Sequence, residues 1–292
     1  MGQTMVTVLI AFMRLIARLP LPWVRRLGTC LGFLLWLFAR KRRHIVRVNL
    51  RCCMPELSEV ERERLAYRHF VAFGQSVLDR SWLWDAPEAL ARSRLRYVGD
   101  LEGLTAPGPL VVFAPHFVGL DAGGLAVGWA VPRPVAFIFV KQSNPKIEAW
   151  VRHGRERSGN ARPYFRHEGV RQILGGLKRG EPLHLSPDMD FGPAESSFVP
   201  FMGVEQAATV PSLSRFSRVG GARVVPVITR MTPRGYDIEV YAPLENFPTA
   251  DLALDTARMN RFLAEMVHTM PEQYHWVHRR LKTRPEGTPG VY

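Results

Sequence analysis

Short apolar runs alternate with amphipathic stretches along most of this chain. Apolar runs of about four to eight residues, bounded by turn residues, are typical of buried strands. Five runs fit this pattern, at residues 110–114, 135–140, 182–186, 223–229 and 236–241. Apolar positions at helical spacing predict helices at 120–130, 145–158, 168–179, 206–219 and 255–270. Strands that alternate with helices favour an α/β fold with a largely parallel or mixed sheet flanked by helices.

The N-terminal region has a different pattern. Residues 5–13 carry no charge, and the uncharged run 27–39 is followed directly by Arg40, Lys41, Arg42 and Arg43. A thirteen-residue helix is about 20 Å long, whereas the hydrocarbon core of a bilayer is about 30 Å thick. We therefore expect an N-terminal membrane-associated helix that lies in the membrane interface, with its basic flank on anionic headgroups. A buried core helix with a solvated basic end is the alternative.

These patterns divide the chain into two parts. Residues 1–52 form an apolar and basic segment that we expect to anchor the protein at a membrane, and residues 53–292 form one α/β domain. Within that domain, 58–78 reads as an amphipathic helix that Ser58 caps, with Glu61 three residues later. No repeat or linker divides the domain further. The order of apolar and basic residues does not match a cleaved signal peptide.

The charge of the chain changes the first guess about its partners. The chain has 292 residues with 39 Lys or Arg and 26 Asp or Glu, a formal net charge of +13. Such a balance ordinarily suggests nucleic acid. However, residues 1–55 hold ten basic residues and no acidic residue, so the rest of the chain has an excess of only three positive charges. We therefore expect a membrane surface, and no nucleic acid, as the partner of the basic segment.

The clearest candidate chemistry follows the strand at 110–114. His116 stands directly after that strand, where open α/β sheets place their ligand crevices, and Asp121 follows five positions later. A carboxylate bonded to one imidazole nitrogen leaves the other nitrogen free to act as a general base. The spacing therefore suggests a dyad of His116 and Asp121. A helix-capping Asp121 and a loop histidine without chemistry remain the alternative.

Two further clusters could contribute to the same site. The cluster of His184, Asp188 and Asp190 lies at the end of the strand at 182–186. It reads as a turn, as part of the crevice, or, together with His116 and Asp121, as the metal site of a hydrolase. Basic residues between 141 and 167 could hold phosphate or form a solvated helix face. They are Lys141, Lys146, Arg152, Arg155, Arg157, Arg162 and Arg166, together with His153 and His167. Cys30, Cys52 and Cys53 form neither a disulfide framework nor a zinc pair, which favours a reducing compartment.

Four ordered blocks resemble one known family. They are APHFVGLD at 114–121, PDMDFGP at 187–193, SSFVPFMGVEQAAT at 196–209 and HWVHRRLKTRP at 275–285. They are similar to the late acyltransferases of lipid A biosynthesis, the lauroyl/myristoyl transferases of Gram-negative bacteria. The resemblance implies a glycerolipid-acyltransferase-like α/β fold, so that residues 53–292 would be the acyltransferase domain. It also implies a location at the cytoplasmic face of the bacterial inner membrane.

The resemblance implies the reaction and the roles of individual residues. The acyl donor would be acyl-acyl carrier protein (acyl-ACP), and the acceptor a hydroxyl of a Kdo-bearing lipid A precursor, with no cofactor and no metal. The catalytic residues would be His116 and Asp121, where many members of the family carry glutamate in place of the aspartate. Arg155 and Arg157 would bind substrate, and Asp188 and Asp190 would have a structural or substrate-positioning role.

Three other functions remain open at this stage. A related membrane acyltransferase could use a lysophospholipid or an amino-acid lipid as acceptor, with the same catalytic residues. A metal-dependent hydrolase would use the cluster around His184. A basic scaffold that binds membranes or nucleic acid would need no catalytic residue.

Overall fold

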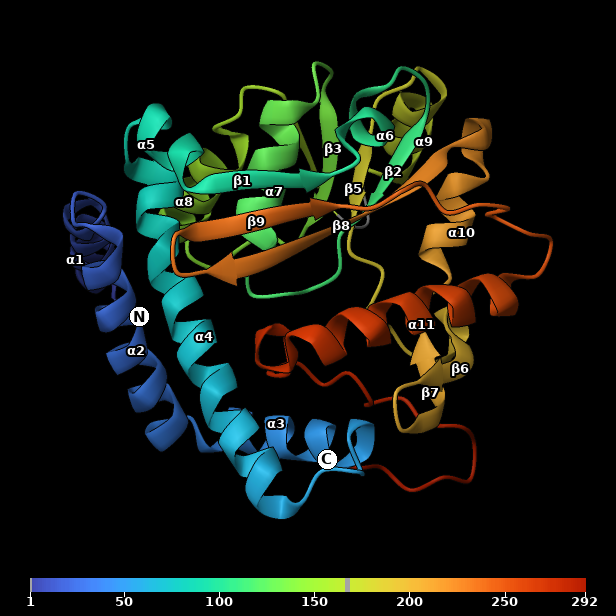
Figure 1. Cartoon of the computed structure of the whole chain (residues 1–292), viewed down its shortest axis with the longest axis horizontal. Coiled ribbons are helices and arrows are strands. Elements are labelled where there is room, and N and C mark those ends of the chain that lie inside the picture. The colour runs from blue at the N-terminus through green and yellow to red at the C-terminus, as the bar shows by residue number, and fades with distance from the viewer. Residues whose placement is uncertain (1, 166–168) are drawn as a thin grey trace.

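Four helices form the N-terminal part of the chain in the computed structural model, which describes residues 2–165 and 169–292. They are α1 (Gln3–Ile16), α2 (Leu21–Phe38), α3 (Arg40–Cys53) and α4 (Glu59–Asp85). The predicted capping box begins α4: the Ser58 side chain accepts a hydrogen bond from the Glu61 backbone, and the Glu61 carboxylate accepts one from the Ser58 backbone. Figure 1 shows α2 lying alongside α4 and α3 turning beneath the body of the protein.

The contact between α2 and α4 is unusually close. A Cβ placed on Gly74 of α4 would lie 2.4 Å from the carbonyl oxygen of Gly28 and 2.7 Å from the Cα of Gly32, both in α2. The same interface holds a buried ion pair in which Arg25 donates to the fully buried Asp79 carboxylate at 2.9 Å. The segment 1–52 therefore packs firmly against the domain that follows it.

A seven-stranded sheet forms the centre of the protein. Its strand order is β1-β9-β8-β2-β5-β3-β4, and every neighbouring pair is parallel except β8 with β9. The strands are β1 (Leu95–Gly99), β2 (Leu110–Phe113), β3 (Val135–Phe139), β4 (Ala161–Phe165), β5 (Leu183–Leu185), β8 (Arg223–Thr232) and β9 (Gly235–Val240). All five strands predicted from apolar runs form, and the mixed α/β fold is confirmed.

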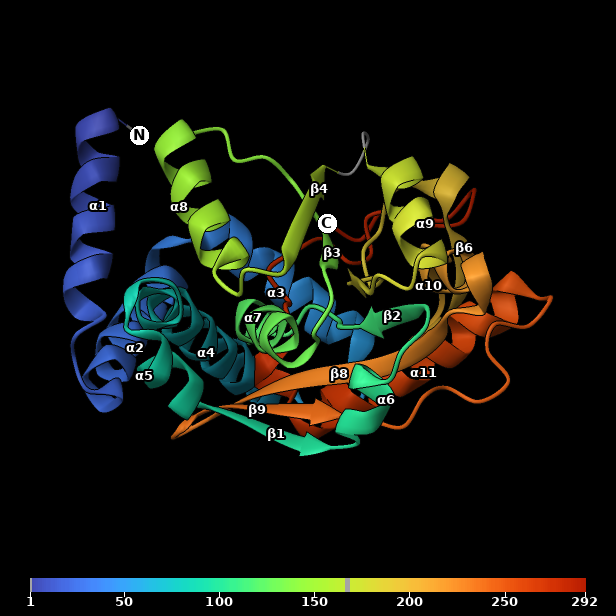
Figure 2. The ribbon, with the colours of Figure 1, turned by 90° about the horizontal axis from the view of Figure 1, so that it is seen from above.

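Helices lie on both faces of the sheet. They are α5 (Glu88–Ser93), α6 (Leu101–Thr105), α7 (Leu120–Ala130), α8 (Pro145–Glu156), α9 (Val170–Lys178), α10 (Ser212–Ser217) and α11 (Leu252–Thr269). In Figure 2, α1, α2, α4 and α8 gather at one end of the molecule, and α9, α10 and α11 lie toward the other end. Most of the predicted helices form close to their expected bounds; residue 168, the expected start of the helix now seen as α9, lies outside the described residues.

The predicted helix at 206–219 is wrong over its first part. Val204–Thr209 is strand β7, which pairs antiparallel with β6 (Ser197–Phe201), and α10 begins only at Ser212. The hairpin turn contains Met202 with a positive φ of 50° and is followed by Gly203. Tertiary contacts explain the difference, because β6 packs on α11 and buries the apolar side of the hairpin.

Two edge strands were missed for a related reason. β1 is exposed at Arg96, Val98 and Gly99 and so forms no buried apolar run, and β4 contains Pro163, which an edge strand tolerates because its outer N–H groups need no partner.

Within the described part of the chain, no helix is both long enough and apolar enough to span a membrane.

Candidate active site

His116 lies directly beyond the C-terminal end of β2, as the sequence predicted. Its ring nitrogen Nδ1 is 2.7 Å from Oδ1 of Asp188, and its backbone N–H donates to Oδ2 of the same carboxylate at 3.0 Å. Asp188 is fully buried, and the hydroxyl of Tyr274 donates to its Oδ2 at 3.2 Å. Because β2 and β5 are neighbouring parallel strands, the loops that follow them meet at one edge of the sheet.

The predicted contact between Asp121 and His116 is wrong. Asp121 does lie in the first turn of α7, but its two carboxylate oxygens accept hydrogen bonds from Arg80 Nε at 2.7 Å and Arg155 Nε at 3.1 Å. Two guanidinium groups, one from α4 and one from α8, attract a carboxylate more strongly than a neutral imidazole does. The residue that orients the His116 ring is therefore Asp188, while Asp121 joins the two arginines beside it.

The electrostatics of the pair suit a general base. Burial alone would lower the pKa of His116, but the charge and hydrogen bond of Asp188 outweigh burial and raise that pKa above its ordinary value of 6.5. Burial opposes the ionised form of Asp188, and the neighbouring His116 and its backbone N–H nevertheless hold the pKa of Asp188 far below its usual range. Since the carboxylate accepts the Nδ1 proton, Nε2 of the neutral ring carries the lone pair. About a quarter of the His116 side chain, 26%, is exposed.

Two more histidines from the C-terminal segment stand beside His116. The rings of His275 and His278 each lie with centroids 6.2 Å from the His116 ring, and the His275 backbone N–H donates to the His116 carbonyl at 2.9 Å. Burial lowers the pKa of His278 to about 4 and holds that of His275 well below its ordinary value, so both rings are neutral at neutral pH. His278 Nδ1 donates to the His275 carbonyl at 2.6 Å, which leaves its buried Nε2 as an acceptor without a partner in the described structure.

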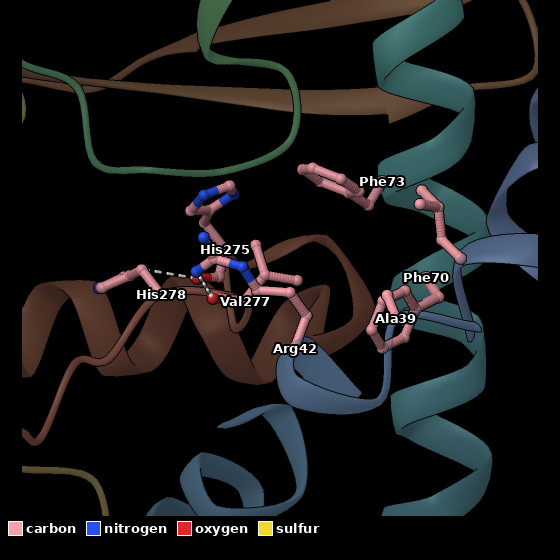
Figure 3. A pocket seen from close by; sticks show the side chains of 8 residues that line it. Ala39, Arg42, Phe70, Phe73, His275, Val277 and His278 are labelled. Atoms are coloured by element: carbon pink, nitrogen blue, oxygen red, sulfur yellow. Dashed lines mark hydrogen bonds between the residues drawn. The ribbon is translucent and has the colours of Figure 1, made fainter. Parts of the chain in front are cut away.

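A cavity of about 230 Å³ opens next to these two histidines (Figure 3). Helices α2, α3 and α4 and the C-terminal segment all contribute to its wall. The lining residues are Leu35, Ala39, Arg42, Phe70, Phe73, His275, Val277 and His278. Figure 3 shows His275 and His278 on one side and Ala39 and Phe70 on the other. The cavity thus joins the N-terminal helices to the surroundings of His116.

The remaining predicted site residues divide into two groups. Arg155 lies in the Asp121 cluster near His116 and is partly exposed. In contrast, Arg157 donates to the carbonyls of Leu83 and Ala86 at the end of α4, and Asp190 accepts hydrogen bonds from the backbone and side chain of Thr283 at 2.7 Å. These bonds hold Arg157 against the end of α4 and Asp190 against the C-terminal segment, and contact of either residue with substrate stays a prediction. Arg166 and His167 lie outside the described residues.

A metal site does not form from the predicted cluster. Across residues 2–165 and 169–292, no three His, Cys, Asp or Glu side chains lie close enough to hold a metal ion. His184 instead packs its ring against Phe137, with centroids 4.9 Å apart, and burial lowers its pKa to about 4. The side chains considered for a hydrolase therefore serve separate purposes.

Comparison with known proteins decides the family. Residues 2–283 match the family model described as bacterial lipid A biosynthesis acyltransferase. The chain belongs to this family. It is 33% identical over 285 residues to the lipid A biosynthesis lauroyltransferase of Escherichia coli K12, an alignment that covers 95% of this chain and 91% of the relative. The palmitoleoyltransferase of the same organism is also 33% identical, covering 94% and 90% of the two chains.

The chain is also similar to a third relative and to one solved structure. The E. coli K12 lipid A biosynthesis myristoyltransferase is 29% identical, over 91% of this chain and 82% of the relative. Among solved structures, the 1-acyl-sn-glycerophosphate acyltransferase PlsC of Thermotoga maritima covers 84% of this chain and 97% of its own with 16% identity and a TM-score of 0.40. Membership of the family makes this chain an acyltransferase of lipid A biosynthesis.

Sequence reasoning missed several members of the site. Arg80, Tyr274, His275 and His278 come from α4 and from the C-terminal segment. The block at 275–285 was a signal for the two histidines, but their position depends on the pairing of this segment with the loop after β2, where Phe117 forms a bridge with Tyr274.

Proposed function

We propose that this protein transfers a fatty acyl chain from the thioester of acyl-ACP to a hydroxyl of a lipid A precursor, with His116 as general base. The observation that carries the proposal is the 2.7 Å contact between His116 Nδ1 and the buried Asp188. This contact fixes the tautomer, so that the accessible Nε2 is the nitrogen that can take a proton. The lipid A precursor is the acceptor because the relatives are lipid A acyltransferases.

The proposed reaction needs one proton carrier. Nε2 of His116 takes the proton of the acceptor hydroxyl while that oxygen attacks the thioester carbonyl carbon. Asp188 stabilises the resulting imidazolium by its negative charge. The carbon–sulfur bond then breaks, and the thiol of the carrier leaves with the proton that His116 returns. An alkanol is a very weak acid, and positioned general-base catalysis contributes roughly 10²–10⁴-fold.

The cluster of Arg80, Asp121 and Arg155 supports substrate binding. Two guanidinium groups share one carboxylate there, which leaves a net positive charge beside His116, and both arginine side chains are about one-third exposed. The lipid A precursor carries phosphate groups, and guanidinium groups bind phosphate through paired hydrogen bonds. We assign Asp121 the role of holding the two arginines in position.

The N-terminal helices supply a surface for membrane docking. Helix α1 exposes Met5, Val8, Phe12 and Leu15 at helical spacing, and α2 exposes a second apolar group up to Phe38, whose side chain is 72% exposed. Exposed apolar surface of this kind, flanked by the basic start of α3, fits an anionic lipid interface. The proposed location is the cytoplasmic face of the bacterial inner membrane, where acyl-ACP is available.

The test is acyl transfer by His116→Ala with labelled lipid A precursor and acyl-ACP, resolved by thin-layer chromatography. We expect a loss of at least about 100-fold, since the general base is removed. His153→Ala, an exposed histidine on α8, is the matched control and should retain the wild-type rate. Transfer by His116→Ala at the rate of the control would show that the proposed base is wrong. Transfer to a lysophospholipid in preference to the lipid A precursor would show that the acceptor is wrong.

A further inference from the structure

We propose that Tyr274 is a positioning residue for the acyl transfer: its hydroxyl fixes the Asp188 carboxylate behind His116 and limits how strongly that carboxylate draws the imidazole proton. The inference rests on the proposed acyl-ACP reaction and adds to it a residue of the C-terminal segment. Tyr274 acts on the reaction through Asp188, and its effect is therefore on the strength and orientation of the base.

The hydrogen bonds to Asp188 come from two separate parts of the chain. His116 supplies two of them, from Nδ1 at 2.7 Å to Oδ1 and from its backbone N–H at 3.0 Å to Oδ2. These two bonds would move with His116 if its loop shifted. The hydroxyl of Tyr274 donates to Oδ2 at 3.2 Å from a different segment, so it fixes the carboxylate relative to the rest of the fold. Asp188 and Tyr274 are both fully buried, and bulk water does not reach this bond.

Backbone pairing holds Tyr274 beside the loop of His116. On one side of it, the Val118 N–H donates to the Gln273 carbonyl at 2.8 Å. On the other side, the His275 N–H donates to the His116 carbonyl at 2.9 Å. The loop that carries the base and the segment that carries the hydroxyl are therefore fixed to each other independently of the side-chain bond.

The ring of Tyr274 is also fixed by packing. Its centroid lies 4.8 Å from that of Trp276, 5.6 Å from that of Phe117 and 6.1 Å from that of Phe201. A phenylalanine at this position keeps all three ring contacts. Tyr274→Phe therefore removes the hydrogen bond to Asp188 and leaves the surrounding core in place.

The sign of the electrostatic effect follows from the bond. A hydrogen bond to an ionised carboxylate stabilises its charge and makes it a weaker acceptor toward a second donor. Without the hydroxyl, the carboxylate should hold the Nδ1 proton more strongly, and the already raised pKa of His116 should rise further. Burial and the charge of Asp188 hold the pKa of Tyr274 well above its ordinary value of 10, so the hydroxyl remains a donor at every pH near neutrality.

Other charged groups around the pair are unchanged by this substitution. Arg155 of α8 lowers the pKa of His116 and Asp121 of α7 raises it, both less than Asp188 does. The neutral rings of His275 and His278 face His116 from the C-terminal segment. Besides Asp188, the groups that face Tyr274 are Arg280 and Cys53, and burial raises the pKa of that thiol to about 12. A change in the titration of His116 in Tyr274→Phe can therefore be assigned to Asp188.

The experiment measures the His116 midpoint by NMR in the full-length protein with ¹³C-labelled histidine, between about pH 5 and pH 9. His116→Ala identifies the signal. Tyr274→Phe should raise the midpoint by about 0.5 unit, since two or three hydrogen bonds together lower a carboxylate pKa by about two units and part of one bond reaches the imidazole. The inflection of kcat for acyl transfer should move upward with it. The highest kcat should fall about tenfold at unchanged KM for acyl-ACP, because a misplacement of about 1 Å can cost 10²-fold.

Tyr236→Phe is the matched control. The Tyr236 hydroxyl also donates to a buried carboxylate, that of Asp79 at 2.7 Å, so this variant loses the same kind of bond away from His116. It should lose stability without moving the midpoint. In an Asp188→Asn background, Tyr274→Phe should cause no further upward shift, since its effect passes through the carboxylate.

The outcomes separate the inference from the proposed reaction. An unchanged or lowered midpoint in Tyr274→Phe would overturn the inference, as would an equal upward shift in Tyr236→Phe or in the Asp188→Asn background. Failure of Tyr274→Phe to fold, judged by circular dichroism, would show that the hydroxyl supports the fold and would also overturn it. Absence of transfer by the wild-type protein would instead contradict the proposed reaction, while the NMR midpoint would still measure the effect of Tyr274 on His116.

Discussion

Replacing Asp188 with asparagine tests the central contact of the site. The substitution keeps the shape of the side chain but removes its charge. The asparagine amide would also face Nδ1 of His116 as a donor or a weaker acceptor, so the ring would lose its preference for the tautomer with a free Nε2. Both effects act on the base, and we expect kcat to fall by about 10²–10⁴-fold, the whole range that a positioned base contributes.

The pH dependence distinguishes this effect from a loss of structure. Asp188 raises the pKa of His116 because its negative charge stabilises the imidazolium. The neutral ring is the base, so wild-type activity should increase as the pH passes upward through that raised pKa. In Asp188→Asn the remaining activity should show its inflection at lower pH, since the stabilising charge is gone.

The assay is the steady-state rate of acyl transfer between about pH 5 and pH 9, the range around the ordinary histidine pKa. Asp121→Asn is the comparison variant. It removes a carboxylate that bonds to Arg80 and Arg155, so it should raise KM more than it moves the inflection. The reasoning is refuted if Asp188→Asn retains kcat within about threefold, or if Asp121→Asn moves the inflection while Asp188→Asn does not.

Two further predictions concern the N-terminal helices. Arg25→Met leaves the fully buried Asp79 carboxylate without its cation, so it should lower the free energy of unfolding by about 3 kcal/mol. Urea denaturation measures this change. The control Arg26→Met, at an exposed position, should change the free energy of unfolding by less than about 0.5 kcal/mol. The double variant Leu15→Gln and Phe38→Gln should weaken binding to vesicles that contain phosphatidylglycerol by at least about tenfold, as each side chain loses apolar contact with lipid. Val60→Gln, exposed on α4, should bind like the wild type; equal binding by all three proteins would exclude docking through α1 and α2.

The position of His116 could be predicted because it follows from local sequence. A short apolar strand followed by a polar loop places that loop at the carboxyl edge of the sheet, whatever the order of the strands. The same reasoning predicted α7 and placed Asp121 in its first turn. It could not tell which side chain would reach the imidazole.

The partner of His116 depends on strand order, which no local pattern contains. Asp188 is 72 residues away in sequence, and it reaches His116 only because β5 pairs with β2. The competing bonds of Asp121 come from α4 and α8, two helices whose sequence pattern does not show which residues they lie beside. The hairpin at 197–209 was misread for the same physical reason, because its burial against α11 is a long-range contact.

Helix α2 joins the two functions that the sequence assigned to separate parts of the chain. One face is fixed to α4 by closely packed glycines and by the Arg25–Asp79 pair, and the opposite face exposes Leu34 and Phe38. Its C-terminal end, at Leu35, borders the cavity beside the catalytic histidine. The face that we propose for lipid contact and the wall of this cavity therefore belong to the same helix. Deleting the N-terminal segment would therefore change stability and membrane binding together, and single substitutions on the separate faces of α2 distinguish the two effects.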